Sequence, residues 1–319
     1  MEGGDSPSGS RSITHGTYTW TDIENASRRD LVELKEKYPF NSLNLDDSIS
    51  QVQPTKIDVH QDHLFILLRF PYFDDHEKAL RPSQVSLFFS KDYLVTIHDG
   101  RFRPLSDVFQ ACAADPQERS ALMGKSPGYL LYAIIQRLLN GLIQIEDNLM
   151  RTLDDIEDKV FDESVATVPE ITKLRREIAF LVRTVTPLRR TIIELGTRVP
   201  SYDSNAISAY FSDLKDGVET AQETLGEAKE TIEIFKDTDF TLNTQKTNKA
   251  IAYLTIVFTL TIPASVVASF YGMNVPLPGG IETGAWTFFG AYTTLILLLL
   301  VSIVPAVLMV LYFRKVRWL

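Results

Sequence analysis

Hydroxyl and carboxamide side chains recur in and just before an apolar stretch near the C-terminus. Steps of three and four residues put seven positions on one helix face: Asn248, Ile251, Thr255, Phe258, Ile262, Ser265 and Ser269. A face that mixes apolar and hydroxyl side chains is typical of the lining of a narrow pore. Helix packing is the alternative, because Ser and Thr are also favoured where apolar helices meet in a bilayer.

Carboxylates are concentrated in two segments. Residues 141–170 hold nine Asp and Glu against two Lys and Arg, and residues 201–240 hold ten against three. Clustered carboxylates on helices usually form a solvated face, but their hard oxygens also suit Mg²⁺. The formal net charge of −9 argues against a nucleic-acid partner and is compatible with binding cations.

Signals for enzyme chemistry are missing from the sequence. There is no phosphate-cradling Gly loop, nucleophile elbow or dinucleotide fingerprint. Cys112 is the one cysteine, so an internal disulfide is excluded, a reducing compartment fits, and a buried thiol is expected. His60 and His63 lie close together but lack further ligands for a metal site. We therefore expect a protein that is not an enzyme.

Two segments are long and apolar enough to cross a bilayer, which needs about 20 residues. These are Ala250–Phe270 and Trp286–Phe313, and between residues 250 and 313 the only carboxylate is Glu282, with no Lys or Arg. The linker Tyr271–Ala285 is too short to hold a domain. The sequence therefore predicts a two-helix transmembrane hairpin, with an external loop at residues 271–285.

The orientation of this hairpin follows from its flanking cations. Lys246 and Lys249 precede the first span, the basic tail at residues 314–319 follows the second, and the linker has no cation. The positive-inside rule then places both ends in the cytoplasm. We expect an integral membrane protein with two spans, in contact with membrane lipid.

Heptad-like runs precede the membrane segment and predict a helical bundle and stalk over residues 126–249. The apolar positions follow helical spacing over Leu130–Val160, Ile171–Leu195 and Ile207–Phe235. Pro187 should kink the second helix. The third is expected to continue into the first span as one helix, Ile207–Phe270.

The N-terminal part is expected to contain a disordered segment at residues 1–16, which is rich in Gly and Ser, and an α/β domain at residues 17–125. A helix over Ser27–Tyr38, capped by Ser27, is predicted. Strands are predicted at four places: Thr17–Thr21, Lys56–Val59, Leu64–Phe70 and Val85–Ile97, the last as two strands around Lys91 and Asp92. The fold class is thus an α+β cytoplasmic domain with a long-helix bundle and a transmembrane hairpin.

The end of the first span reads Tyr271-Gly272-Met273-Asn274. It resembles the signature of the CorA family of magnesium and divalent-cation transporters. The resemblance is strengthened by its place at the outer end of the penultimate span, by Pro263 within that span, and by the basic ending at residues 314–319. It is convincing from about Leu130 onward.

This resemblance implies a funnel-shaped homopentamer in a prokaryotic plasma membrane that carries Mg²⁺, with Co²⁺ or Ni²⁺ as further cargo. Gly272, Met273 and Asn274 would form the selectivity filter at the outer mouth. Five residues would line the pore: Asn248, Ile251, Leu254, Ile262 and Ser265.

The family resemblance also implies that intracellular Mg²⁺ bridges neighbouring subunits and holds the pore closed. Asp213 falls where one such regulatory acid is expected, and Asp92 and Asp99 are candidates for its partner. The linker departs from the family pattern, because family linkers are often acidic and Glu282 is the single acid here.

Two other functions stay open. A ZntB-like zinc transporter shares the expected architecture, although the methionine in Gly272-Met273-Asn274 favours the magnesium branch. A membrane-anchored sensor or scaffold that conducts nothing is the second alternative, and the polar face of the first span argues against it.

Overall fold

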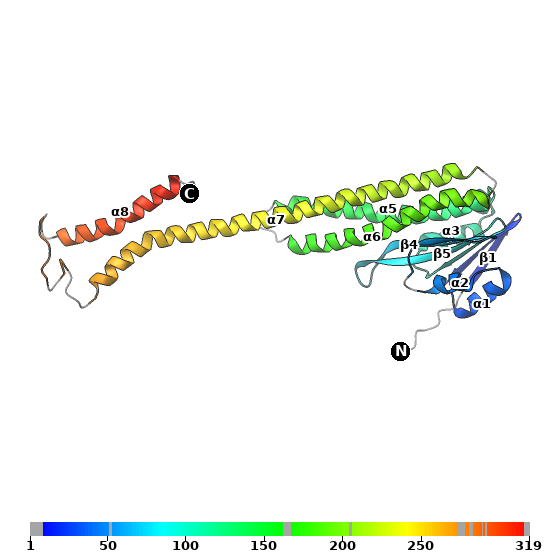
Figure 1. The fold of residues 1–319 in the computed structure, drawn as a ribbon, viewed down its shortest axis with the longest axis horizontal. Coiled ribbons are helices and arrows are strands. Elements are labelled where there is room, and N and C mark those ends of the chain that lie inside the picture. Colours follow the sequence, from blue (N-terminus) through cyan, green and yellow to red (C-terminus); the bar gives the residue numbers. More distant parts are fainter. Residues whose placement is uncertain are drawn as a thin grey trace. The chain divides into compact units, whose positions relative to one another are not determined.

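The structure is a computed structural model, and it describes residues 9–50, 53–161, 167–203, 206–273, 278–280, 283–288, 290 and 292–315. The chain divides into two compact units, Met1–Lys236 and Asp237–Leu319. Each unit is described separately below (Figure 1).

The first unit contains a six-stranded sheet in the order β1-β2-β6-β5-β4-β3. Its strands are β1 Gly9–His15, β2 Tyr18–Glu24, β3 Lys56–Val59, β4 Leu64–Asp74, β5 Ala79–Phe89 and β6 Tyr93–His98. Only β2 and β6 pair in parallel, and the other neighbours are antiparallel. The predicted run Val85–Ile97 is indeed two strands, which turn at Lys91 and Asp92.

The expectation of disorder over residues 1–16 is wrong for Gly9–His15, while residues 1–8 lie outside the described part. The strand forms because β2 supplies partners for its side chains. Arg11 Nη2 lies 2.7 Å from the buried Asp22 Oδ2, and the Ser12 and Thr21 hydroxyls are 2.9 Å apart. These contacts depend on strand pairing, which local composition does not reveal.

Helices α1 (Arg28–Lys37) and α2 (Ser42–Ile49) cover one face of the sheet (Figure 1). The predicted helix and its cap are confirmed, since Ser27 and Asp30 form a reciprocal capping box that satisfies helix-end donors. The apolar core on this face includes Leu34, Leu45 and Phe88. α2 was not predicted, because its eight residues are too short for a clear helical period.

The opposite face carries α3 (Arg103–Ala114), α4 (Pro116–Met123) and the helical bundle. Cys112 on α3 is fully buried, and burial raises the pKa of its thiol above the ordinary value. The expectation of a buried thiol is therefore confirmed, and a raised pKa lowers the fraction of the nucleophilic thiolate. α3 and α4 were missed in the sequence.

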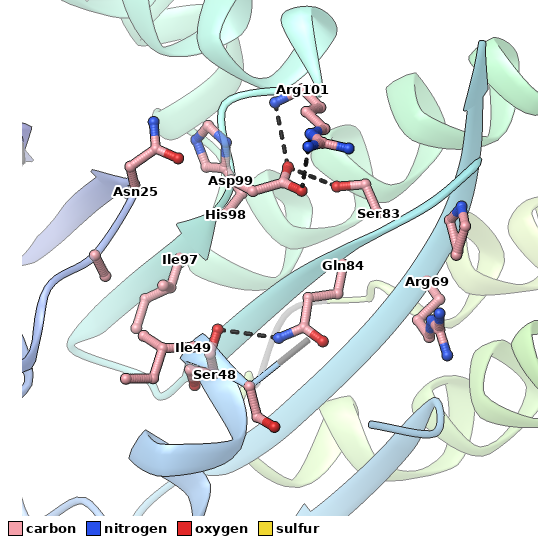
Figure 2. Close-up of a pocket in the computed structure, with 13 residues that line it drawn as sticks. Asn25, Ser48, Ile49, Arg69, Ser83, Gln84, Ile97, His98, Asp99 and Arg101 are labelled. Atoms are coloured by element: carbon pink, nitrogen blue, oxygen red, sulfur yellow. Dashed lines mark hydrogen bonds and ion pairs between the residues drawn. The ribbon is translucent and has the colours of Figure 1, made fainter. Parts of the chain in front are cut away.

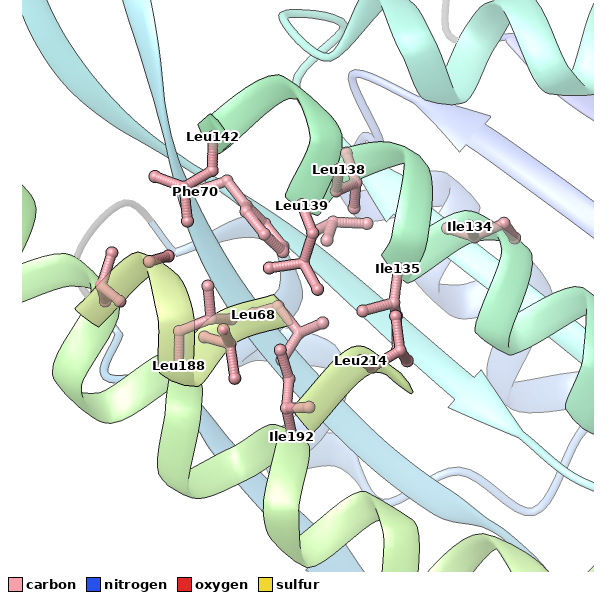
Figure 3. Close-up of a cluster of buried hydrophobic side chains, with 14 of the residues drawn as sticks. Leu68, Phe70, Ile134, Ile135, Leu138, Leu139, Leu142, Leu188, Ile192 and Leu214 are labelled. Carbon is pink, nitrogen blue, oxygen red and sulfur yellow. The ribbon is translucent and has the colours of Figure 1, made fainter. Parts of the chain in front are cut away.

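The bundle consists of α5 (Pro127–Val160), α6 (Val168–Arg198) and the first part of α7 (Ser208–Tyr271), with a short 3₁₀ turn at Val199–Ser201. Its core is continuous with the sheet (Figure 3), where Leu68, Leu188 and Ile192 are all completely buried. Truncating one such side chain to Ala costs about 2–5 kcal/mol. Pro187 lies inside α6 without ending it.

The second unit contains the last part of α7 and α8 (Thr293–Lys315). Both helices are long and apolar enough to cross a membrane, by length and composition. The second span was predicted from Trp286, but α8 begins seven residues later. Gly290 has φ +101°, which an α-helix cannot accommodate, and residues 286–288 are not helical.

Candidate ion pathway and regulatory acids

The predicted pore-lining residues all lie on α7, which is one continuous helix from Ser208 to Tyr271. At about 100° per residue, they fall within an arc of about 120° on one face. This set is Asn248, Ile251, Leu254, Ile262 and Ser265, and all five are exposed in the single chain. An exposed apolar face on a helix of this length requires lipid or further protein to cover it.

Hydroxyl groups in this part of α7 are partly satisfied inside the helix. Thr255 donates to the carbonyl of Ile251 at 2.8 Å, and Thr261 donates to that of Val257 at 2.9 Å. Such back-bonds let a hydroxyl face an apolar neighbour at little cost. Thr255 is therefore as compatible with lipid as with a pore, which weakens its use as a sign of a water-filled path.

The helix ends immediately before the predicted filter. The Gly272 N–H still donates to the Ala268 carbonyl at 2.9 Å, and the Met273 N–H donates to that of Phe270 at 3.2 Å. A Cβ on Gly272 would lie 3.1 Å from the Ala268 oxygen, which is tighter than ordinary contact. A glycine at position 272 therefore lets the last turn of α7 form without crowding between a side chain and the Ala268 carbonyl oxygen. Asn274, the third filter residue, lies outside the described residues.

The segment after the filter folds back onto the end of α7 through one described contact. The Tyr271 hydroxyl donates to the Pro278 carbonyl at 2.9 Å. Gly279 has φ +78°, and a Cβ there would lie 3.1 Å from the Trp286 ring. Glycine is therefore favoured at position 279 for two reasons: its φ is positive, and a side chain there would crowd the Trp286 indole. Glu282 lies outside the described residues.

Asp213, the predicted regulatory acid, is exposed on α7 and held by two donors from α5. The Tyr132 hydroxyl donates to its Oδ2 at 3.1 Å, and Gln136 Nε2 donates to the same oxygen at 3.4 Å. Burial, with Asp213 beside it, raises the pKa of Tyr132 to about 12. The second oxygen of Asp213 has no hydrogen bond to the described residues. The carboxylate is therefore oriented and accessible.

The two candidate partner acids do not share a site within one chain. Asp92 is exposed in the turn before β6, and Asp99 follows the end of β6. The six residues of β6 lie between them, and seven steps of about 3.3 Å separate the two acids by roughly 23 Å. The Asp99 carboxylate already accepts two hydrogen bonds, from the Ser83 hydroxyl at 2.5 Å and from the Arg101 backbone N–H at 3.2 Å.

Part of the acid-rich surface is neutralised by arginines and lysines of neighbouring helices. Glu219 on α7 pairs with Arg189 on α6 at 2.5 Å, and Glu233 pairs with Arg175 at 2.5 Å. Within the described residues no group of three or more His, Cys, Asp or Glu could hold a metal ion.

An α/β domain, a long-helix bundle and two apolar C-terminal helices together define a membrane protein of two spans. The chain belongs to the CorA-like Mg²⁺ transporter protein family, whose family model matches residues 15–315. The cobalt/magnesium transport protein CorA of Thermotoga maritima is 27% identical over 306 residues, which cover 95% of this chain and 84% of that protein.

Solved structures support the same fold. The CorA magnesium transporter from Methanocaldococcus jannaschii matches with a TM-score of 0.77 at 18% identity, covering 96% of this chain and 94% of that one. The ZntB cytoplasmic domain from Vibrio parahaemolyticus matches with a TM-score of 0.60 at 15% identity, covering 72% and 90%. At these identities the likeness concerns the fold alone.

Sequence reasoning missed the donors to Asp213. Tyr132 and Gln136 are four residues apart on α5, so they lie on one face one turn apart. That spacing was visible, but their contact with Asp213 depends on the register between α5 and α7. Helical periodicity does not determine this register.

Proposed function

We propose that this chain is a subunit of a channel that carries Mg²⁺, with Co²⁺ or Ni²⁺ as further cargo. The observation that carries the proposal is the position of Gly272-Met273-Asn274, directly after the last turn of a helix whose final stretch is apolar and exposed. Membership of the CorA-like family supports it. The proposed protein transports ions and catalyses no covalent chemistry.

The chemistry of Asn274 suits a hydrated cation. Mg²⁺ gives up its water reluctantly, so a selective mouth can recognise the hydrated ion. A ring of Asn274 carboxamides would offer oxygens to the bound waters without fixed charge. Such a ring attracts the ion and still releases it, as conduction requires. A ring of carboxylates would bind more tightly and trap it.

Several subunits are needed to make this mouth. One pair of helices leaves no polar interior through which an ion could pass. We propose a homopentamer in a plasma membrane, with both termini in the cytoplasm, because Lys246, Lys249 and the basic tail flank the spans. The α7 face that contains Ile251 and Leu254 would line the axis.

We further propose that intracellular Mg²⁺ closes the channel by binding between subunits, with Asp213 as one ligand. Its exposed carboxylate, oriented by Tyr132 at 3.1 Å, supports this role. α7 contains both Asp213 and the pore-lining residues in one helix. A movement of α7 near Asp213 would therefore be passed along the same helix to the pore-lining residues.

A zinc transporter is the second candidate, because the cytoplasmic fold resembles that of the ZntB domain. The test is metal uptake into liposomes that contain the purified protein, comparing Mg²⁺, Co²⁺, Ni²⁺ and Zn²⁺. Faster uptake of Mg²⁺ than of Zn²⁺ supports the proposal. Transport of Zn²⁺ alone would assign the chain to the second candidate, and no transport of any ion would indicate a sensor or scaffold.

A further inference from the structure

A row of polar side chains crosses four strands of the sheet beyond the apolar core that α2 covers. Arg69 on β4 lies opposite Gln84 on β5. Extending the β5–β6 and β2–β6 registers by one residue places Gln84 beside Asp99 and Asp99 beside Asn25. Opposite residues share a face of a sheet. The four side chains therefore continue the face that carries Leu67 and Ile97.

This row is the floor of a cavity of about 480 Å³ (Figure 2). That volume lies within the usual range for small-molecule sites. Its side wall is the end of α2, with Ser48, Ile49 and Ser50. Gln84 fixes this wall, because its Nε2 donates to the carbonyls of Asp47 and Ser48 at 3.0 Å each. The shape of the cavity is therefore held by hydrogen bonds between the sheet and α2.

Positive charge predominates in the cavity. Arg69 donates only a long 3.4 Å hydrogen bond to the Gln53 carbonyl, and no carboxylate of the described residues forms an ion pair with it. Arg101 lies 3.6 Å from Asp99, which also accepts from Ser83 and the Arg101 backbone. The Arg101 guanidinium also lies over the Tyr72 ring, 5.0 Å from its centroid. Arg69 is therefore the arginine of the lining that has no ion pair with the described residues.

The remaining lining is neutral and of two kinds. Hydroxyl and amide groups come from Asn25, Ser48 and Ser50, an apolar strip comes from Ile49 and Ile97 on one side of the polar row, and Pro82 lies on the other side. His98 offers no nitrogen to a ligand, since its Nδ1 accepts from the Gly100 N–H at 3.1 Å and its Nε2 is buried 3.2 Å from Asp22 Oδ1. The cavity thus combines cationic, hydrogen-bonding and apolar walls.

We propose that this cavity binds a nucleotide, with its phosphate at Arg69 and its base against Ile49 and Ile97. The planar fork of a guanidinium matches a phosphate with two parallel hydrogen bonds. The neutral donors and acceptors suit the ribose hydroxyls and the edges of a base. The site lies in the first unit and is separate from the proposed ion pathway, so it does not depend on transport.

The test is calorimetric titration of the full-length protein in detergent with AMP, in magnesium-free buffer. We expect saturable binding, weakened at least about tenfold in Arg69→Gln, as loss of a charged hydrogen bond implies. Arg81→Gln is the matched control, because Arg81 is an exposed arginine of the neighbouring strand that does not line the cavity. It should bind AMP like the wild type.

Arg69→Lys provides a second variant if Arg69→Gln does not fold, and it should also weaken AMP binding, because lysine keeps the charge but cannot form two parallel hydrogen bonds to a phosphate. Absence of saturable AMP binding to the wild type would overturn the proposal, as would unchanged binding in a folded Arg69→Gln or Arg69→Lys protein. Inorganic phosphate is the second probe. Phosphate that binds as tightly as AMP would contradict a nucleotide site, because the apolar strip would then contribute nothing.

Discussion

Tyr132 on α5 donates a hydrogen bond across the bundle to Asp213 on α7, with 3.1 Å between the phenol oxygen and Asp213 Oδ2. The phenol is nearly buried while the carboxylate is exposed. One oxygen of Asp213 is therefore committed to the bundle, and the other is open to solvent. This arrangement is suited to a ligand that joins two subunits.

Replacing Asp213 by Ala should weaken inhibition by internal Mg²⁺ while leaving conduction intact, since Asp213 is not among the residues of the proposed ion pathway. Binding to the closed state alone stabilises that state by RT ln(1 + [L]/Kd) for each site, so losing a ligand moves the inhibition curve to higher Mg²⁺. The measurement is flux at graded internal Mg²⁺. Asp216→Ala, another exposed acid of α7, is the control and should leave the curve unshifted.

Tyr132→Phe should move the same curve in the same direction, by less than Asp213→Ala does. It keeps the Asp213 carboxylate but removes a hydrogen bond that orients it. Inhibition should then begin at higher internal Mg²⁺, with a loss of stability of about 1 kcal/mol for the missing hydrogen bond. Curves that coincide with the wild type in both Asp213→Ala and Tyr132→Phe would remove this acid from the sensor.

Glu146 on α5 makes stability depend on pH. It is only 3% exposed, its Oε1 has no hydrogen-bond partner among the described residues, and burial, with Asp147 nearby, raises its pKa from 4.5 to about 8. The folded state therefore prefers the protonated acid. This preference contributes fully to stability below pH 4.5 and is lost as pH rises through about 8.

Glu146→Gln imitates the protonated form and should remove this dependence. Its stability relative to the wild type should increase between pH 5 and 8, by at most about 1.4 kcal/mol per pH unit. Denaturant unfolding at several pH values measures it. Glu157→Gln, at an exposed position of the same helix, is the control. Equal pH profiles for the wild type and Glu146→Gln would contradict the raised pKa of the Glu146 carboxyl.

The uncovered apolar face of α7 is the observation on which the proposed oligomer rests. None of its apolar 18-residue window is buried in the single chain, and Ile251, Leu254 and Ile262 are 56%, 60% and 53% exposed. Native mass measurement of the detergent-solubilised protein should give a closed ring, a pentamer. Monomers or dimers that still transport Mg²⁺ would refute the pore.

Long helices were the most predictable part of the fold. The pattern from Ile207 to Phe270 predicted one helix, and α7 runs from Ser208 to Tyr271, because a repeating apolar stripe is a local signal. β1 could not be predicted, since it forms only by pairing with β2. The start of α8 was misplaced because the apolar run from Trp286 hides the backbone conformation of Gly290.

In the candidate site, too, only features made of residues close together in the sequence could be predicted. The motif that ends at Asn274 was visible as three consecutive residues. The contact between Tyr132 and Asp213 joins positions 81 residues apart, and the row of Arg69, Gln84 and Asp99 depends on strand register. Such juxtapositions arise from tertiary packing, which no single segment encodes.

The most direct measurement is Mg²⁺ flux into liposomes that contain purified wild-type or Asn274→Ala protein at equal amounts of assembled oligomer. Removing the carboxamide takes away the dipoles that hold the hydrated ion and leaves the helices intact, so flux should fall to background. Asn243→Ala, at an exposed position of α7 before the membrane segment, should conduct like the wild type. Near wild-type flux through an assembled Asn274→Ala channel would contradict the assignment of this residue to the selectivity filter.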